Sequence, residues 1–248
     1  MVDVMVLCYH AVSPSWAASL SVTPDALERQ LSWLTARGWQ GTTFHEAVMA
    51  PVAPRTLAVT FDDAFSSVLD LAYPILQSLG LPATVFVPTS FVSSGKPLCW
   101  PGIDVWAGTP DAVELGCLSW DALGQLAQEG WEIGSHTCTH PHLTAIGADV
   151  VRAELAQSRA EVSEHLGGDC LSIAYPYGDV DHRVAEAAAD AGYRVGASMS
   201  SHLAQLGSLR WPRLGIYHVD GFDRFRLKTT RPMRWLRGSR LWPQDWIK

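Results

Sequence analysis

The feature that most constrains the fold is a recurring unit: a short apolar run, a loop, an amphipathic segment and then a glycine before the next run. The runs are Val4–Tyr9, Leu57–Phe61, Ala83–Val87, Glu132–Ser135, Leu171–Tyr175, Arg194–Ala197 and Leu214–Tyr217. Apolar runs that alternate with helices are typical of βα units, and their composition predicts buried parallel strands. We therefore predict a single-domain α/β protein, a distorted (β/α) barrel of about seven parallel strands. An open doubly wound sheet is the alternative.

Helix ends support this organisation. Thr23 can cap a helix that has Pro24 as its first residue, and Gly38 ends it. Pro74 lies inside the second predicted helix and predicts a kink or an early break. The other four helices are each followed directly by glycine, and are predicted over 64–79, 120–129, 149–166 and 182–191.

Composition indicates a chain that folds throughout, with 48% apolar and 17% charged residues. Its five cysteines show no CxxC spacing, and their odd number is a poor basis for a disulfide framework, so a reducing compartment is expected. The first ten residues, MVDVMVLCYH, lack a basic region, and no apolar run reaches the roughly 20 residues needed to span a bilayer. We expect a cytoplasmic protein without signal peptide or transmembrane segment.

Charge is distributed unevenly. Residues 223–248 carry eight Lys or Arg and two Asp, a net charge of +6, which leaves −13 for the rest of a chain whose total is −7. The acidic body argues against nucleic-acid binding. We predict a barrel over 1–222 and a basic, aromatic tail over 223–248. The tail either contacts an anionic membrane peripherally or wraps the acidic barrel.

Two carboxylates, Asp62 and Asp63, directly follow the strand predicted over Leu57–Phe61. The carboxyl ends of barrel strands are where catalytic groups lie. Adjacent acids point in different directions, so one can bind a metal while the other stays free as a base. The same pair could instead cap the next helix.

Three histidines lie within seven residues after the strand predicted over Glu132–Ser135. His136 and His140 are four residues apart, so both rings can reach one ion. Two imidazoles and one carboxylate indicate a site for zinc or another first-row divalent metal. Histidines that are merely satisfied in a polar loop are the alternative. We do not include His142 or Cys138 in the site.

Three motifs together resemble a known family. Thr60-Phe61-Asp62-Asp63, the element from His136 to His140, and Tyr175-Pro176-Tyr177-Gly178 resemble, in order, the first three motifs of the polysaccharide deacetylases that share the NodB homology domain (carbohydrate esterase family 4). The resemblance runs from about residue 4 to residue 220. It implies a distorted (β/α) barrel. It further implies Asp63, His136 and His140 as metal ligands, Asp62 as general base, and the Tyr177 N–H as a donor to the oxyanion.

Two departures from that family pattern concern catalysis. Ala174 stands where the family often has an arginine that orients the base, and Arg213 is the candidate replacement. The family's late Leu-x-His motif, source of its general acid, is absent. However, the segment from Cys8 to Val12 resembles the opening motif of the subgroup acting on poly-N-acetylglucosamine, which implies His10 as the general acid. A capping or core role for His10 is the alternative.

The long segment 88–118 holds two tryptophans, Trp100 and Trp106, and interrupts the regular pattern. Long loops at such places are often functional, although these rings could simply cover the core. With Tyr175, they are our candidate contacts to a sugar.

We therefore predict a metal-dependent enzyme that removes N-acetyl groups from an amino sugar or its glycan and releases acetate. Zinc is the expected ion, with cobalt, nickel, manganese or iron as alternatives. The competing interpretations are an amidohydrolase acting on a non-sugar amide and a catalytically silent glycan- or lipid-binding module. A Ser-His-Asp hydrolase is disfavoured because the sequence has no G-x-S-x-G elbow.

Overall fold

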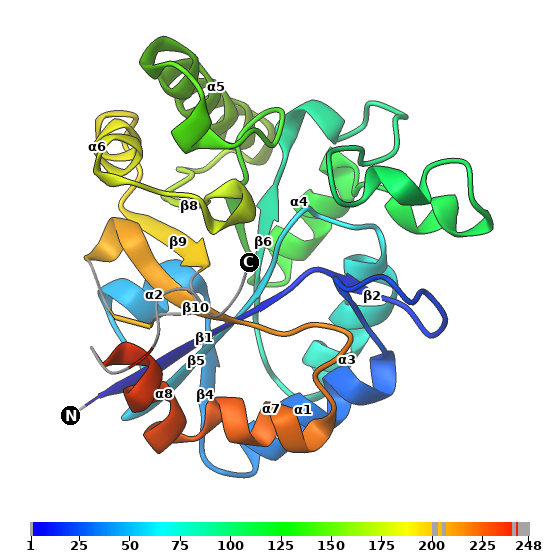
Figure 1. The fold of residues 1–248 in the computed structure, drawn as a ribbon, viewed down its shortest axis with the longest axis vertical. Helices are drawn as coiled ribbons and strands as arrows, with labels where there is room; N and C mark the ends of the chain where they lie inside the picture. Colours follow the sequence, from blue (N-terminus) through cyan, green and yellow to red (C-terminus); the bar gives the residue numbers. More distant parts are fainter. Residues whose placement is uncertain (1, 200–202, 205–206, 240–241, 243–248) are drawn as a thin grey trace.

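The computed structural model describes residues 2–199, 203–204, 207–239 and 242. Its centre is a closed barrel of parallel strands in the order β1-β10-β9-β8-β7-β6-β5, and pairing of β1 with β5 closes the ring (Figure 1). The strands are β1 (Asp3–Tyr9), β5 (Arg55–Phe61), β6 (Thr84–Val87), β7 (Glu132–Ser135), β8 (Ser172–Ala174), β9 (Val195–Met199) and β10 (Trp211–Gly215). The predicted barrel and its seven strands are confirmed, and closure excludes the open sheet.

Three further short strands were not predicted. β4 (Gln40–Thr42) pairs with residues 56–58 of β5, whereas β6 pairs with residues 60–61 on the same side. β2 (Ala11–Val12) and β3 (Ser21–Val22) form a separate two-stranded sheet after β1. Strands of two or three residues are too short to leave a periodic signal in the sequence.

Helices surround the barrel (Figure 1). Thr23 caps the first helix by accepting a hydrogen bond from the Ala26 N–H, with Pro24 as the first residue, as predicted. The helices are α1 (Pro24–Thr35), α2 (Phe44–Met49), α3 (Tyr73–Ser78), α4 (Trp120–Gln128), α5 (Ala148–Leu166), α6 (His182–Asp190), α7 (Phe222–Thr229) and α8 (Arg231–Gly238).

The helix predicted over 64–79 begins later than expected. Asp63 and Ala64 have φ values of 69° and 53°, which are left-handed and incompatible with the start of a right-handed helix. A π-helical stretch, Val68–Ala72, follows and leads into α3. Pro74 is the second residue of α3, directly after the π-helical stretch. In place of the predicted kink or early break, the helix changes from π-helical to α-helical just before Pro74.

Strand side chains alternate between two apolar clusters, as the two-residue period of a strand requires. Leu7, Val59 and Phe61 belong to a large cluster that includes helix residues such as Leu27. The intervening strand positions belong to a small second cluster, whose members are Val6, Ala58, Phe86, Ala174, Val195 and Ala197 together with Phe44 and Ala47 from α2. Four of these eight residues are alanine, and the buried Arg213 guanidinium lies over the Phe86 ring of the same cluster.

The described part of the basic tail packs against the barrel. Phe225 on α7 is fully buried, and Arg234 on α8 donates two 2.7 Å hydrogen bonds to the carboxylate of Asp3 at the start of β1. Trp246 lies outside the described residues. Contact of the tail with an anionic membrane stays a prediction. No helix in the described ranges has both the length and the apolar character needed to cross a bilayer.

Candidate active site

Strand register brings the predicted motifs together at one end of the barrel. Tyr9 pairs with Phe61, so the next residues, His10 and Asp62, leave neighbouring strands side by side. The Asp62 N–H extends this pairing by donating to the Tyr9 carbonyl oxygen at 3.0 Å. His136 follows β7 at the same end. These are the carboxyl ends of the strands, where α/β barrels carry their active sites.

Asp63, His136 and His140 form a compact buried group. Asp63 Oδ1 lies 3.2 Å from His136 Nε2 and 3.4 Å from His140 Nε2, and it has no hydrogen-bond partner among the described residues. Ligand atoms held tetrahedrally by one zinc ion at about 2.0–2.1 Å lie about 3.3–3.4 Å apart. The three residues therefore fit a divalent metal in both donor chemistry and spacing.

The two imidazoles are held differently. His136 Nδ1 lies 2.8 Å from the Ala174 carbonyl oxygen, a hydrogen bond that leaves Nε2 to face Asp63. The His140 ring stacks on Trp100, with centroids 3.9 Å apart, and its Nδ1 has no partner among the described residues. Burial is the largest influence on both rings and lowers the pKa of His140. At His136 the carboxylates of Asp63 and Asp62, together with the Ala174 carbonyl, outweigh burial and raise the pKa.

Left-handed backbone is concentrated at this site. Outside glycine, six described residues have positive φ, and all but Ser93 belong to the three motifs or directly follow one. Such conformations cost about 1–3 kcal/mol each and persist where the surroundings impose them, often at functional sites. The five are Asp63, Ala64, Thr137, His140 and Tyr177.

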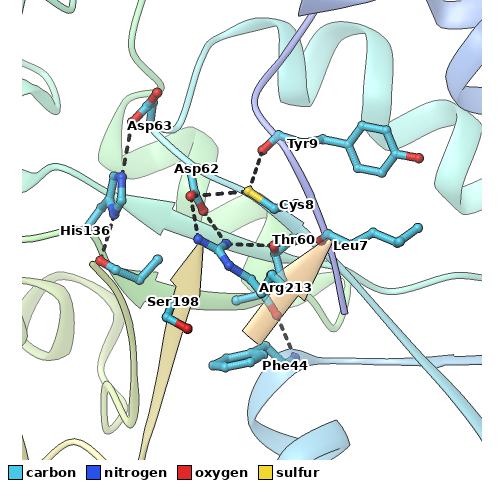
Figure 2. Close-up of polar contacts among 12 residues, drawn as sticks. Leu7, Cys8, Tyr9, Phe44, Thr60, Asp62, Asp63, His136, Ser198 and Arg213 are labelled. Atoms are coloured by element: carbon cyan, nitrogen blue, oxygen red, sulfur yellow. Dashed lines mark hydrogen bonds and ion pairs between the residues drawn. The ribbon is translucent and has the colours of Figure 1, made fainter. Parts of the chain in front are cut away.

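Asp62 has separate surroundings from Asp63. Arg213 Nη1 and Nη2 donate to its Oδ1 and Oδ2, each at 2.7 Å, and the Cys8 thiol donates to Oδ2 at 3.4 Å (Figure 2). Burial alone would raise the pKa of Asp62, but the Arg213 guanidinium and nearby His136 lower it to about 2. The carboxylate is therefore ionised at neutral pH.

His10 lies beside Asp62 in the same cavity. Its Nδ1 is buried and has no hydrogen-bond partner among the described residues. Burial lowers the pKa of His10, although Asp63 and Asp62 oppose this effect. Its ring lies against Tyr217, with centroids 6.4 Å apart. The neutral form of His10 is therefore favoured more than in a free imidazole.

A cavity of about 300 Å³ collects these groups. Tyr177 lines it with its exposed ring stacked on His142, and Trp100 forms part of the wall. The lining residues are His10, Ser19, Leu20, Asp62, Asp63, Trp100, Pro101, Gly102, Ile103, His136, His140, Tyr177, Gly178, Met199 and Tyr217.

Two predicted sugar contacts do not line this cavity. Trp106 packs edge-on against Trp16, with centroids 5.6 Å apart, so its ring covers core. Tyr175 is fully buried and donates its hydroxyl to the Leu209 carbonyl oxygen at 2.9 Å. Since both rings are engaged in packing, the structure does not support them as substrate contacts.

Some supporting residues were not predicted. Cys8 is the first residue of the predicted opening motif but was given no role. It lies two positions before His10, and the two-residue period of a strand could have indicated that their side chains face the same way. Glu154 on α5 accepts hydrogen bonds from the loop between His136 and His140. It is one of several acids on that helix, and nothing in the sequence distinguishes it.

The fold and the grouped motifs define a deacetylase-type barrel, and comparison with known families agrees. The profile of the family described as polysaccharide deacetylase matches residues 50–196, more than half of the chain. The protein belongs to the polysaccharide deacetylase family.

Individual relatives are more distant. The chain is 25% identical over 198 residues to the putative polysaccharide deacetylase YxkH of Bacillus subtilis, a match covering 78% of this chain and 63% of YxkH. It is 24% identical over 205 residues to a poly-beta-1,6-N-acetyl-D-glucosamine N-deacetylase of Staphylococcus aureus, covering 77% of this chain and 65% of that protein. The chain thus spans less than two thirds of either relative.

Solved structures share the fold. The deacetylase PplD of Streptococcus pyogenes, in complex with acetate, superposes with a TM-score of 0.77 at 24% identity, covering 91% of this chain and 97% of PplD. IcaB from Ammonifex degensii gives a TM-score of 0.72 at 22% identity, covering 96% and 98% of the two chains. At these identities the likeness concerns the barrel itself.

Proposed function

We propose that the protein is a metal-dependent N-deacetylase that releases acetate from an amino sugar or a glycan that contains one. The observation that carries this proposal is the presence, in one cavity, of the Asp63-His136-His140 group and a second, ionised carboxylate, Asp62, held by Arg213. The names of the relatives, which include an N-deacetylase of poly-N-acetylglucosamine, support the reaction class.

Asp63, His136 and His140 would hold the ion, with zinc favoured by two imidazoles and one carboxylate and with cobalt, nickel, manganese or iron as alternatives. A divalent cation there would polarise the acetamide carbonyl and acidify the attacking water, which lowers the basicity required of the neighbouring carboxylate. The Ala174 carbonyl supports this role by fixing the His136 ring with Nε2 toward the ion.

Asp62 takes the proton from the attacking water. Its ion pair with Arg213 keeps the carboxylate charged and fixes its orientation, so the acceptor lone pair is in place before the substrate arrives. Thr60 steadies the guanidinium in turn by accepting from Arg213 Nη1 at 2.9 Å. Arg213 thus performs the orienting task that Ala174 cannot.

His10 supplies the proton that an amine needs in order to leave. Burial favours its neutral form before reaction, and one of its ring nitrogens lies within 4.8 Å of an Asp62 oxygen. The proton taken from water by Asp62 can pass to His10 and then to the departing nitrogen, so no external acid is required. The Tyr177 N–H is assigned to the developing oxyanion, a contact type worth about 3–4 kcal/mol in other enzymes.

An amino sugar is favoured as substrate over a non-sugar amide because Trp100 and Tyr177 give the cavity aromatic walls on either side of His140. Sugar rings pack their apolar faces on such rings. A silent binding module is disfavoured because it would not need the buried, oriented Asp62 carboxylate.

The test is acetate release from metal-loaded protein across N-acetylated mono-, oligo- and lipid-linked sugars and simple amides. Acetate should appear from at least one sugar and cease after chelation. Turnover of non-sugar amides alone would favour the amidohydrolase, and metal binding without acetate from any substrate would favour the binding module.

A further inference from the structure

We propose that Glu154, on α5, is a positioning residue for the metal ligands: its carboxylate holds the loop between His136 and His140 in the one conformation that aims both imidazoles at Asp63. The inference rests on the metal-binding part of the proposed function. It assigns a role to a side chain that contacts neither the substrate cavity nor the ligand atoms.

The evidence is a set of three hydrogen bonds to one carboxylate. Glu154 Oε2 accepts from the backbone N–H groups of Cys138 and Thr139 at 2.7 and 3.0 Å. Glu154 Oε1 accepts from the Thr139 hydroxyl at 2.6 Å. Charged acceptors make the stronger class of hydrogen bond, so this carboxylate ties the centre of the loop to α5.

Four other backbone groups of the loop are bonded elsewhere. Its first and last N–H groups use nearby hydroxyls: Thr137 N–H donates to Ser135 Oγ and His140 N–H to Thr137 Oγ1, both at 3.1 Å. The carbonyl oxygens of residues 137 and 138 accept from the N–H groups of residues 89 and 90. Glu154 therefore supplies the acceptor for the two central N–H groups.

This support matters because the loop is strained. Thr137 and His140 have φ values of 66° and 60°, which side chains larger than glycine adopt only when the surroundings impose them. His136 is also held by its strand and by the Ala174 carbonyl, whereas no side-chain or backbone partner holds Nδ1 of His140 among the described residues. Loss of Glu154 should therefore displace His140 first.

The experiment measures zinc affinity of the metal-free protein by competition with a chromophoric chelator, together with its thermal unfolding. Glu154→Ala should bind zinc about 10- to 100-fold more weakly, the usual loss when an outer partner of a metal site is removed. Glu154→Gln should stay within a few-fold of wild type, because an amide oxygen can accept from both N–H groups while its NH2 faces the Thr139 hydroxyl. Glu164→Ala, an exposed acid on the same helix, is the matched control and should match wild type.

Each outcome bears on the inference. Wild-type zinc affinity in Glu154→Ala would overturn the inference. If Glu154→Gln lost as much zinc affinity as Glu154→Ala, the negative charge of Glu154 would matter and its hydrogen bonds to the loop would not, which would also overturn the inference. If Glu154→Ala does not fold, Thr139→Val removes one of the three hydrogen bonds and should still weaken zinc binding a few-fold; unchanged affinity there also overturns the inference. Absence of zinc binding by wild-type protein would instead contradict the proposed function itself.

Discussion

Arg213, on the last strand of the barrel, donates both terminal nitrogens of its guanidinium to the two carboxylate oxygens of Asp62, each at 2.7 Å. Both side chains are buried, with exposed fractions of 1% and 5%. A buried carboxylate stays ionised only with such a partner, so the pair decides both the charge of Asp62 and its direction.

Breaking this pair should cost stability as well as activity. Arg213→Ala leaves an unpaired buried charge, and we expect a loss of about 3–5 kcal/mol in unfolding free energy. Arg213→Lys keeps the charge but loses the two-pronged contact, so it should be more stable than the alanine variant and still slow in turnover. Urea unfolding and acetate release measure the two effects. Wild-type stability in Arg213→Ala would contradict the buried ion pair.

Substitution of the two adjacent acids, Asp62 and Asp63, should have different effects. Asp62→Asn is expected to keep metal affinity but lose most turnover, whereas Asp63→Ala should weaken metal binding too, because only Asp63 faces His136 and His140. Metal titration of both variants beside kcat measurement makes the comparison. Equal metal loss in the two would show that the roles are wrongly assigned.

The general-acid role of His10 can be tested by changing the leaving group of the substrate. His10→Ala should depress hydrolysis of an ordinary acetamide far more than that of an activated ester, whose leaving group needs no proton. The two rates are compared at matched metal occupancy. Equal losses on both substrates would return His10 to a structural role.

Asp62 should also leave a signature in acid. Its pKa is about 2 in the folded protein, against 3.8 for the unperturbed group. A depressed folded pKa stabilises the fold at pH values above the unfolded pKa, and this contribution is lost as pH falls from about 4 toward 2. The contribution is on the order of 2 kcal/mol. Urea midpoints of the metal-free protein over that range should show a shallower decline for Asp62→Asn. Parallel curves for wild type and variant would contradict the expectation.

The contact of the tail with the barrel makes a fifth prediction. Arg234 and Asp3 form a two-pronged, partly buried pair, and Arg234 lowers the pKa of Asp3. A double-mutant cycle with Arg234→Ala and Asp3→Asn should give a coupling of about 1 kcal/mol. Arg226→Ala, on the exposed side of α7, is the control and should change stability little. A coupling near zero would mean that α8 is held by its other contacts, such as the hydrogen bond from the Leu203 N–H to the Arg237 carbonyl oxygen.

Much of the architecture follows from local sequence pattern. The barrel strands are apolar on both faces and bounded by glycine-terminated helices, so their positions were predictable to within about three residues at each end. The shift is largest at β10, which begins at Trp211 and not at Leu214, because Pro212 and Arg213 interrupt the apolar run. The two eight-residue helices α7 and α8, which form most of the described part of the basic tail, were not predicted.

The predictable part of the candidate site is the part that lies at strand ends. Asp62, Asp63, His136 and His10 occupy such ends, and parallel register necessarily gathers them. Orientation was not predictable, since whether a ring faces the cavity or the core depends on packing between distant segments. That is why Trp100 lines the cavity while Trp106 packs on Trp16. The left-handed Asp63 and Ala64 likewise depend on the closed barrel, and they delay the helix after them.

The order of the strands along the chain sets the order in which the residues of the candidate site are synthesised. The three proposed metal ligands have all been synthesised once residue 140 has been added, and β1 and β5 are available to pair early because both precede residue 62. Arg213 arrives last, on the strand inserted between β1 and β9. A nascent chain therefore carries all three proposed ligands before Asp62 has its buried partner, and the proposed base gains its counter-charge only when β10 completes the barrel.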